Sequence, residues 1–105
     1  MTEFNNVTVQ KEANIYFEGK VISTSISFPN GSKKTLGVML PGEYEFNTEQ
    51  QEIMEIISGK LEVLLSNKSK WMNLKAGATF EVPKNSSFKL KIHEITNYCC
   101  DYVAE

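Results

Sequence analysis

The chain has 105 residues, of which 41% are hydrophobic. This length and composition suffice for one folded domain with one core and exclude an intrinsically disordered chain. The net charge of −2 argues against a surface for nucleic acid or for an anionic membrane.

No apolar stretch approaches the length that crosses a bilayer, and the first residues carry neither the basic nor the apolar segment of a secretory signal. We therefore expect a cytoplasmic protein. All eleven basic side chains are lysines. A bound phosphate would thus be held by lysine, hydroxyl or backbone N–H groups rather than by an arginine fork.

The chain divides into a short arm and one domain. Residues 1–13 show no convincing period and are expected to form a mobile arm, or at most one edge strand. From Asn14 onward, turn residues recur about every eight to twelve residues, which is typical of a sandwich or barrel of short strands. Residues 14–105 are therefore expected to form the domain.

Alternation of apolar and polar side chains locates the strands within this domain. It predicts strands over residues 21–28, 34–40, 43–46, 52–57, 60–65, 71–74, 79–82, 87–93 and 97–103. A helix could begin at Thr48, but the β-branched run that follows favours a strand. The sequence predicts an all-β jelly roll or cupin, that is, a small barrel.

Acidic side chains are concentrated in one part of the domain. Five of the thirteen lie within residues 43–55, namely Glu43, Glu45, Glu49, Glu52 and Glu55. Glu43 and Glu45 share one face of their strand, and Glu52 shares a face with Met54 and Ile56. A carboxylate beside apolar side chains costs free energy unless it has a partner, and such groups are often functional. We take Glu43, Glu45 and Glu52 as candidate catalytic residues.

The orientation of the strand over residues 43–46 stays open. If its aromatic side chains, Tyr44 and Phe46, point inward, then Glu43 and Glu45 face solvent. Aromatic and methionine side chains are also the candidates for lining an apolar pocket, although most will simply be core.

Other catalytic devices are missing from the sequence. His93 is the only histidine and lies on the face of its strand that carries lysines, and it has no Ser-His-Asp context. Cys99 and Cys100 are adjacent, so we expect two reduced thiols rather than a disulfide or a zinc site. The glycines stand singly at turns and form no phosphate-binding loop.

Two spacings resemble the general cupin motifs. Glu43 and Glu45 stand where the first motif has two metal-binding histidines, Glu52 stands at its glutamate, and Phe88 stands at the histidine of the second motif. Because phenylalanine binds no metal, the simplest interpretation is a pocket without metal or other cofactor. The alternative is a hard cation held by the three carboxylates.

Four segments together resemble the bacterial pyrimidine/purine nucleoside phosphorylase family. They are residues 14–21 (NIYFEGKV), 37–46 (GVMLPGEYEF), 52–59 (EIMEIISG) and 77–83 (GATFEVP). The resemblance spans roughly residues 14–103, and family members carry an arginine where this chain has Asp101. It implies a cupin that converts a nucleoside and inorganic phosphate to ribose 1-phosphate and a free base, with broad base tolerance.

Roles within this reaction follow from residue type. A carboxylate among Glu43, Glu45 and Glu52 would stabilise the cation-like sugar or bind its hydroxyls. Lys20 and Ser23 are candidates for binding phosphate. The candidates for the base pocket are Tyr44, Met54, Phe80 and Phe88. Two alternative functions stay open, a non-catalytic ligand-binding cupin and a metal-dependent cupin.

We expect a homodimer, because small β domains gain buried surface by pairing.

Overall fold

The computed structural model describes residues 2–103, which form eleven strands and one short 3-10 helix. In chain order these are β1 (Thr8–Val9), β2 (Asn14–Tyr16), η1 (Phe17–Gly19), β3 (Val21–Ser27), β4 (Lys33–Met39), β5 (Gly42–Asn47), β6 (Gln51–Ser58), β7 (Lys60–Leu65), β8 (Met72–Lys75), β9 (Thr79–Val82), β10 (Ser87–Ile92) and β11 (Thr96–Val103). No helix in this range has the length and apolar character needed to cross a bilayer. The prediction of an all-β domain is confirmed.

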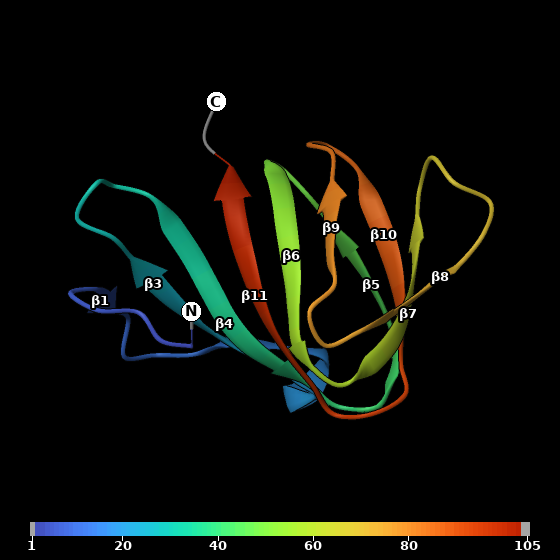
Figure 1. The fold of residues 1–105 in the computed structure, drawn as a ribbon, viewed down its shortest axis with the longest axis horizontal. Helices are drawn as coiled ribbons and strands as arrows, with labels where there is room; N and C mark the ends of the chain where they lie inside the picture. The colour runs from blue at the N-terminus through green and yellow to red at the C-terminus, as the bar shows by residue number, and fades with distance from the viewer. Residues whose placement is uncertain (1, 104–105) are drawn as a thin grey trace.

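The strands form two antiparallel sheets that face each other. The larger sheet has the order β1-β3-β4-β11-β6-β9, with β2 added to β3, and the smaller one has the order β5-β10-β7-β8. Figure 1 shows the strands converging at the lower edge and fanning apart toward the upper edge. The two sheets enclose the hydrophobic core between them.

Alternation along each strand places the core between the sheets. In β7 and β10, the buried side chains Leu61, Val63, Leu90 and Ile92 alternate with more exposed ones. Each such side chain contributes about 1.5–3 kcal/mol when it is fully buried. On the larger sheet, Met54 and Ile56 of β6 and Tyr98 and Cys100 of β11 belong to the same core.

The strand predictions agree with the structure to within one residue at each end for all nine segments. The segment that could have begun as a helix is strand β6, which pairs with β11 on one side and β9 on the other. The prediction did not separate β2, because three residues are too few to show a period.

The N-terminal segment adds an edge strand to the larger sheet. Thr8 and Val9 pair with Ser27 and Ile26 of β3. Farther toward the N-terminus, the ring of Phe4 packs edge-on against that of Phe28, with 5.2 Å between centroids.

Candidate functional site

A cavity of about 140 Å³ lies between the two sheets. One half of its wall is apolar and is formed by Met39, Phe46, Met54, Phe88 and Leu90. Phe46 and Phe88 stack with their ring centroids 5.7 Å apart. These two rings come from neighbouring strands, where they are directly opposite in the β5–β10 register.

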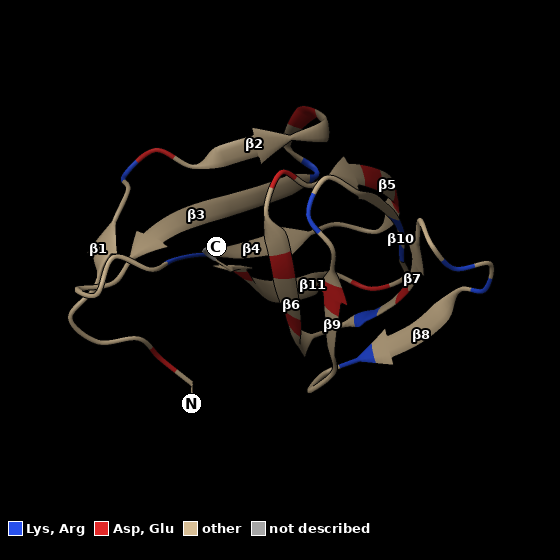
Figure 2. Cartoon of the chain, turned by 90° about the horizontal axis from the view of Figure 1, so that it is seen from above, with Lys and Arg blue, Asp and Glu red and all other residues tan. Residues whose placement is uncertain are grey.

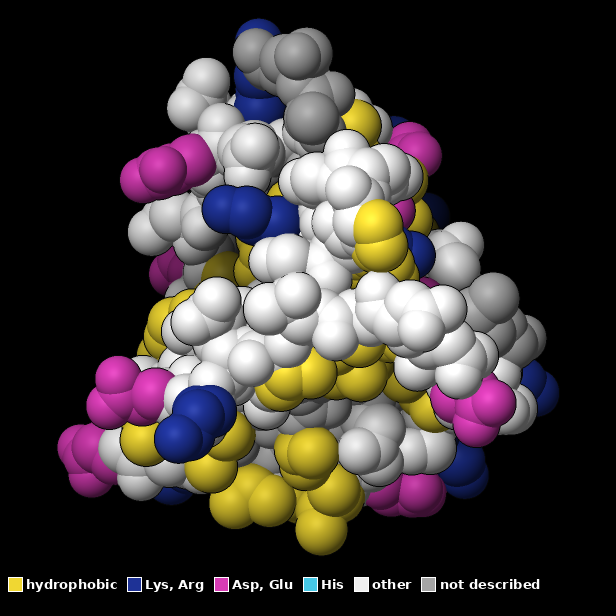
Figure 3. Space-filling model, turned by 90° about the vertical axis from the view of Figure 1, so that its left-hand side faces the viewer, with side chains coloured by type: hydrophobic (Ala, Val, Ile, Leu, Met, Phe, Trp, Pro, Cys, Tyr) yellow, Lys and Arg dark blue, Asp and Glu magenta, His cyan; other side chains and the backbone are white. Residues whose placement is uncertain are grey.

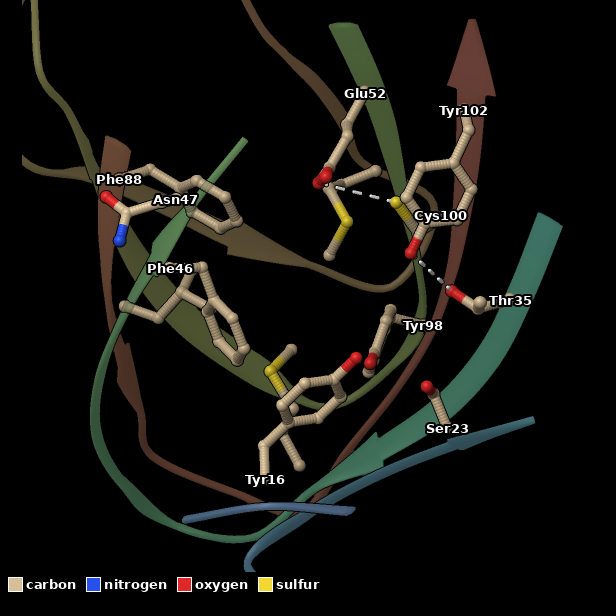
Figure 4. A pocket seen from close by; sticks show the side chains of 13 residues that line it. Tyr16, Ser23, Thr35, Phe46, Asn47, Glu52, Phe88, Tyr98, Cys100 and Tyr102 are labelled. Atoms are coloured by element: carbon tan, nitrogen blue, oxygen red, sulfur yellow. Dashed lines mark hydrogen bonds between the residues drawn. The ribbon is translucent and has the colours of Figure 1, made fainter. Parts of the chain in front are cut away.

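The other half of the wall carries hydroxyl groups. Ser23, Thr35, Tyr98 and Tyr102 contribute them from β3, β4 and β11, and Tyr16 closes the cavity from β2. Figure 4 shows this hydroxyl wall facing Phe46 and Phe88 across the cavity. The Oγ1 atom of Thr35 and the hydroxyl oxygen of Tyr102 are 3.5 Å apart. The site is thus amphipathic, with a polar and an apolar side.

Three adjacent strands set the position of Tyr98. Gly37 of β4 is paired with Ser23 on one side and with Tyr98 on the other. The ring of Tyr98 covers Gly37, and its hydroxyl group interacts with the Ser23 side chain, which lowers the pKa of the tyrosine. Burial has the larger, opposite effect and raises this pKa above its ordinary value.

Glu52 is the carboxylate of the cavity wall within the described residues. It lies on the inner face of β6, where its Cα is paired with that of Tyr102. The Cys100 thiol donates a hydrogen bond to Glu52 Oε1, with Sγ and Oε1 3.5 Å apart (Figure 4). Burial raises the pKa of Glu52, and this hydrogen bond partly offsets the increase.

The groups around Glu52 stay protonated at neutral pH. Burial is the main reason why the pKa values of Cys100, Tyr98 and Tyr102 all lie well above their ordinary values. The charge of Glu52 adds to the increase at Cys100. These three side chains are therefore hydrogen-bond donors and not bases.

Glu43 and Glu45 lie outside the cavity. Of the two orientations left open for this strand, β5 has Tyr44 buried and both glutamates exposed. The Tyr44 hydroxyl donates a 2.7 Å hydrogen bond to the carbonyl of Leu40, which fixes this orientation. Figure 2 shows acidic residues on β5, β6 and β9, and of these Glu52 alone lines the cavity within the described residues. This removes the geometric basis for a catalytic role of Glu43 and Glu45.

The two residues considered for phosphate binding have different positions. Ser23 lines the cavity and is buried. Lys20 is exposed and lies away from the cavity wall, and its carbonyl accepts a hydrogen bond from the Leu40 N–H. Lys33 lies opposite Tyr102 in the β4–β11 register and lines a wider depression that shares Tyr16, Thr35 and Tyr102 with the cavity.

The four candidates for the base pocket also lie in two different places. Met54 and Phe88 line the cavity, whereas Tyr44 and Phe80 belong to the core behind it. Phe80 packs edge-on against Phe88, with 6.0 Å between centroids, and so supports the wall without forming it.

Sequence reasoning named Ser23 and Glu52 but missed other polar members of the wall, among them Thr35, Cys100 and Tyr102. Tyr98, Cys100 and Tyr102 lie two residues apart on one face of β11, so they point the same way as Glu52 on the adjacent strand. This period of two is visible in the sequence. The pairing of β11 between β4 and β6, which brings the residues together, is not.

The residues at the cupin metal positions do not fit a metal ion. Glu43 and Glu45 project from the outside of the smaller sheet, Glu52 projects into the cavity, and Phe88 offers no ligand atom. Within residues 2–103, no group of three or more His, Cys, Asp or Glu side chains is placed to hold an ion. The alternative of three carboxylates on one cation therefore lacks its geometry.

Asp101 also lies away from the cavity. It is on the opposite face of β11 from Cys100 and Tyr102, and its Cα is paired with that of Lys34. Lys34 in turn lies over the rings of Phe4 and Phe28, at 5.5 and 5.7 Å from their centroids.

The fold is that of a single-barrel cupin. A cupin superfamily protein from Desulfitobacterium hafniense has a similar structure, with a TM-score of 0.68 at 11% identity over 90% of this chain and 84% of that one. A crystal structure from Acinetobacter sp. ADP1, of a protein of unknown function, gives a TM-score of 0.93 at 42% identity, covering 96% and 98% of the two chains.

The family model described as pyrimidine/purine nucleoside phosphorylase matches residues 11–102. A protein of that name from Chlorobium chlorochromatii is 58% identical over 103 residues, which cover 98% of this chain and 99% of the relative. The chain therefore belongs to the pyrimidine/purine nucleoside phosphorylase family.

Proposed function

We propose that the chain catalyses phosphorolysis of purine and pyrimidine nucleosides. The observation that carries this proposal is the amphipathic cavity, in which one carboxylate lies between an aromatic wall and a wall of hydroxyl groups. The names of the family and of its relatives support the same reaction.

The apolar half of the cavity suits a nucleobase. The rings of Phe46 and Phe88 and the thioether of Met54 offer flat, polarisable surface. A cavity of about 150 Å³ is large enough for one benzene-sized ring. Contacts of this kind discriminate weakly between rings of similar size, so we expect broad base specificity.

The sugar then lies beside Glu52. As the N-glycosidic bond breaks, the anomeric carbon becomes cation-like, and a nearby carboxylate stabilises the transition state. Because the site is partly buried, this attraction is less screened than it would be at the surface. We therefore assign to Glu52 alone the stabilisation of the cation-like sugar, for which the sequence had offered Glu43, Glu45 and Glu52.

Phosphate binds at the mouth of the cavity. Thr35 and Tyr102 border both the cavity and the wider depression, and Lys33 lies on the same side of the sheet next to Tyr102. Hydroxyl groups donate hydrogen bonds to the anion, and the lysine supplies a point charge. Ser23 contributes a further hydroxyl from deeper in the wall.

A homodimer is the expected assembly. Hydrophobic side chains gather along the lower part of the face in Figure 3. Ile15, Ile22 and Val38 are exposed and lie side by side on β2, β3 and β4, and Phe17 and Leu40 are exposed as well. A second copy of the chain would cover them.

The test is incubation of the purified protein with uridine or inosine, with and without phosphate, followed by chromatography of the free base. Base release that depends on phosphate is the expected result. Absence of release would reject the enzyme and leave a ligand-binding cupin. Activity that disappears with EDTA and returns with a metal ion would point to the metal-dependent alternative.

A further inference from the structure

Phosphorolysis moves a proton as well as a sugar, and the inference below rests on the proposed function. At neutral pH a hydrogen phosphate dianion attacks the anomeric carbon through one oxygen. The electron pair of the N-glycosidic bond leaves with the base. The products balance as ribose 1-phosphate dianion and a neutral base that has gained the proton of the phosphate. Some group must carry that proton.

Several groups of the cavity wall cannot accept the proton in this step. Cys100, Tyr98 and Tyr102 keep their own protons, since burial raises their pKa values. Serine and threonine hydroxyls are still weaker bases. His93, the chain's single histidine, directly follows β10, with its Nε2 atom 2.7 Å from Glu62 Oε2, and both residues lie outside the cavity wall.

Glu52 has the position and the chemistry that the step requires. Its strand neighbour Tyr102 lies at the mouth, where phosphate is proposed to bind, and Met54 lies two residues along the same face toward the base pocket. In Figure 4 the carboxylate lies between the hydroxyl wall and the aromatic wall. The Cys100 thiol engages Oε1, so within the described residues Oε2 is left to accept a hydrogen bond from a ligand.

We propose that Glu52 accepts the proton of the attacking phosphate and delivers it to the leaving nitrogen of the base. In the first half, the phosphate O–H bond breaks as a glutamic acid O–H bond forms. In the second half, that O–H bond breaks as the base N–H bond forms, and Glu52 returns to its carboxylate form. The neutral acid that exists between these halves is favoured by the partly apolar surroundings.

A consequence concerns the choice of oxyanion. Phosphate and arsenate carry a proton at neutral pH and can donate a hydrogen bond to the Glu52 carboxylate. Sulfate carries none, so its oxygens are repelled by the carboxylate. Glu52 therefore selects protonated oxyanions in addition to moving the proton.

The decisive experiment compares two leaving groups. Inosine needs protonation of its base, whereas 4-nitrophenyl riboside releases a phenolate that is stable without a proton. We expect Glu52→Gln to lower kcat on both substrates, because the carboxylate stabilises the cation-like sugar in both, but to lower it at least about tenfold more on inosine than on the nitrophenyl riboside. Glu55→Gln, on the exposed face of the same strand, should match the wild type on both substrates.

The outcomes separate this inference from the proposed function. An equal loss on both substrates, or no loss on either, would overturn proton transfer by Glu52 while the phosphorylase remains. A wild-type protein that releases no base in the presence of phosphate would overturn both.

Binding gives a second readout that needs no turnover. Sulfate should compete with phosphate at least about tenfold better in Glu52→Gln than in the wild type, and equal competition would contradict the proposal.

Discussion

The ring of Tyr98 occupies the space that a side chain at Gly37 would fill. A Cβ atom at Gly37 would lie 2.5 Å from Tyr98 Cζ and 2.6 Å from its hydroxyl oxygen. Real Cβ atoms do not approach other heavy atoms this closely. The glycine therefore allows Tyr98 to cross its neighbouring strand and reach Ser23, and it is a requirement of the site as well as of the fold.

Gly37→Ala should displace Tyr98 and damage the hydroxyl wall. We expect kcat/KM to fall by about 10- to 100-fold, because small displacements of positioning groups are costly in catalysis. The free energy of unfolding should fall by about 1–3 kcal/mol through overpacking. Steady-state phosphorolysis and urea unfolding measure the two effects.

A double-mutant cycle checks the cause of that effect. In a Tyr98→Ala background the ring is gone, so the added methyl group of Gly37→Ala should cost little further stability. Equal stability costs in both backgrounds would show that the alanine acts through the backbone and not through Tyr98.

The two outward glutamates of β5 should be dispensable. Both glutamates are exposed, and each has a lysine as its cross-strand neighbour in the β5–β10 register, Lys91 for Glu43 and Lys89 for Glu45. Such pairs contribute about 0–1 kcal/mol. We expect Glu43→Gln and Glu45→Gln to keep kcat within about twofold of the wild type. A large loss of kcat in either variant would show that a glutamate of the first cupin motif takes part in catalysis.

Lys33 and Lys20 form a matched pair of lysines for the phosphate site. Lys33→Met should raise the KM for phosphate by about tenfold, equivalent to about 1.4 kcal/mol, because it removes a charge at the mouth of the cavity. Lys20→Met should leave this KM unchanged, since Lys20 lies away from the cavity wall. The reverse order in initial-rate measurements would place phosphate on the other side of the barrel.

Glu52 should make stability depend on pH. Since burial raises its folded-state pKa, its favourable contribution is fully present below the unfolded-state value near 4.5 and is lost as the pH rises through the folded-state value. Compared with Glu52→Gln, the wild type should therefore lose stability as the pH is raised through this window. Thermal unfolding from acid to neutral pH measures the difference, and parallel profiles would contradict the burial of this carboxyl group.

Thr48 connects two loops at one end of the barrel. Its Oγ1 donates a 2.7 Å hydrogen bond to the Pro83 carbonyl and accepts one of 3.0 Å from the Ser86 N–H. Thr48→Val should lower the free energy of unfolding by about 1–3 kcal/mol by leaving buried polar groups unpaired. The control is Thr79→Val on the exposed face of β9, for which urea unfolding should show a change within about 0.5 kcal/mol.

The strands could be predicted because one face of each is buried. Leu61 and Val63, or Phe88 and Leu90, show this alternation in the sequence alone. A period of two defines two faces but does not say which one is inside. In β5 both faces carried plausible inward residues, and the orientation was settled by Tyr44, whose ring packs in the core and whose hydroxyl reaches the Leu40 carbonyl.

The candidate site was harder to predict from the sequence than the strands were, because its residues come from strands that are distant in sequence. Glu52 and Cys100 are 48 residues apart and meet only because β6 and β11 pair. Lys20 belongs to a segment that resembles the family, yet its side chain is exposed, and its carbonyl is the group that the fold uses. A local resemblance identifies a residue that matters without saying which of its atoms is used.

Phosphorus NMR of the protein with inosine and inorganic phosphate tests the central claim most directly. The phosphate signal should decrease as a sugar phosphate signal grows, in step with an equal amount of hypoxanthine. Release of hypoxanthine with the phosphate signal unchanged would show hydrolysis by water, and an unchanged mixture would show that the cavity binds without reacting. Either result would contradict a pocket built for phosphate attack on a nucleoside.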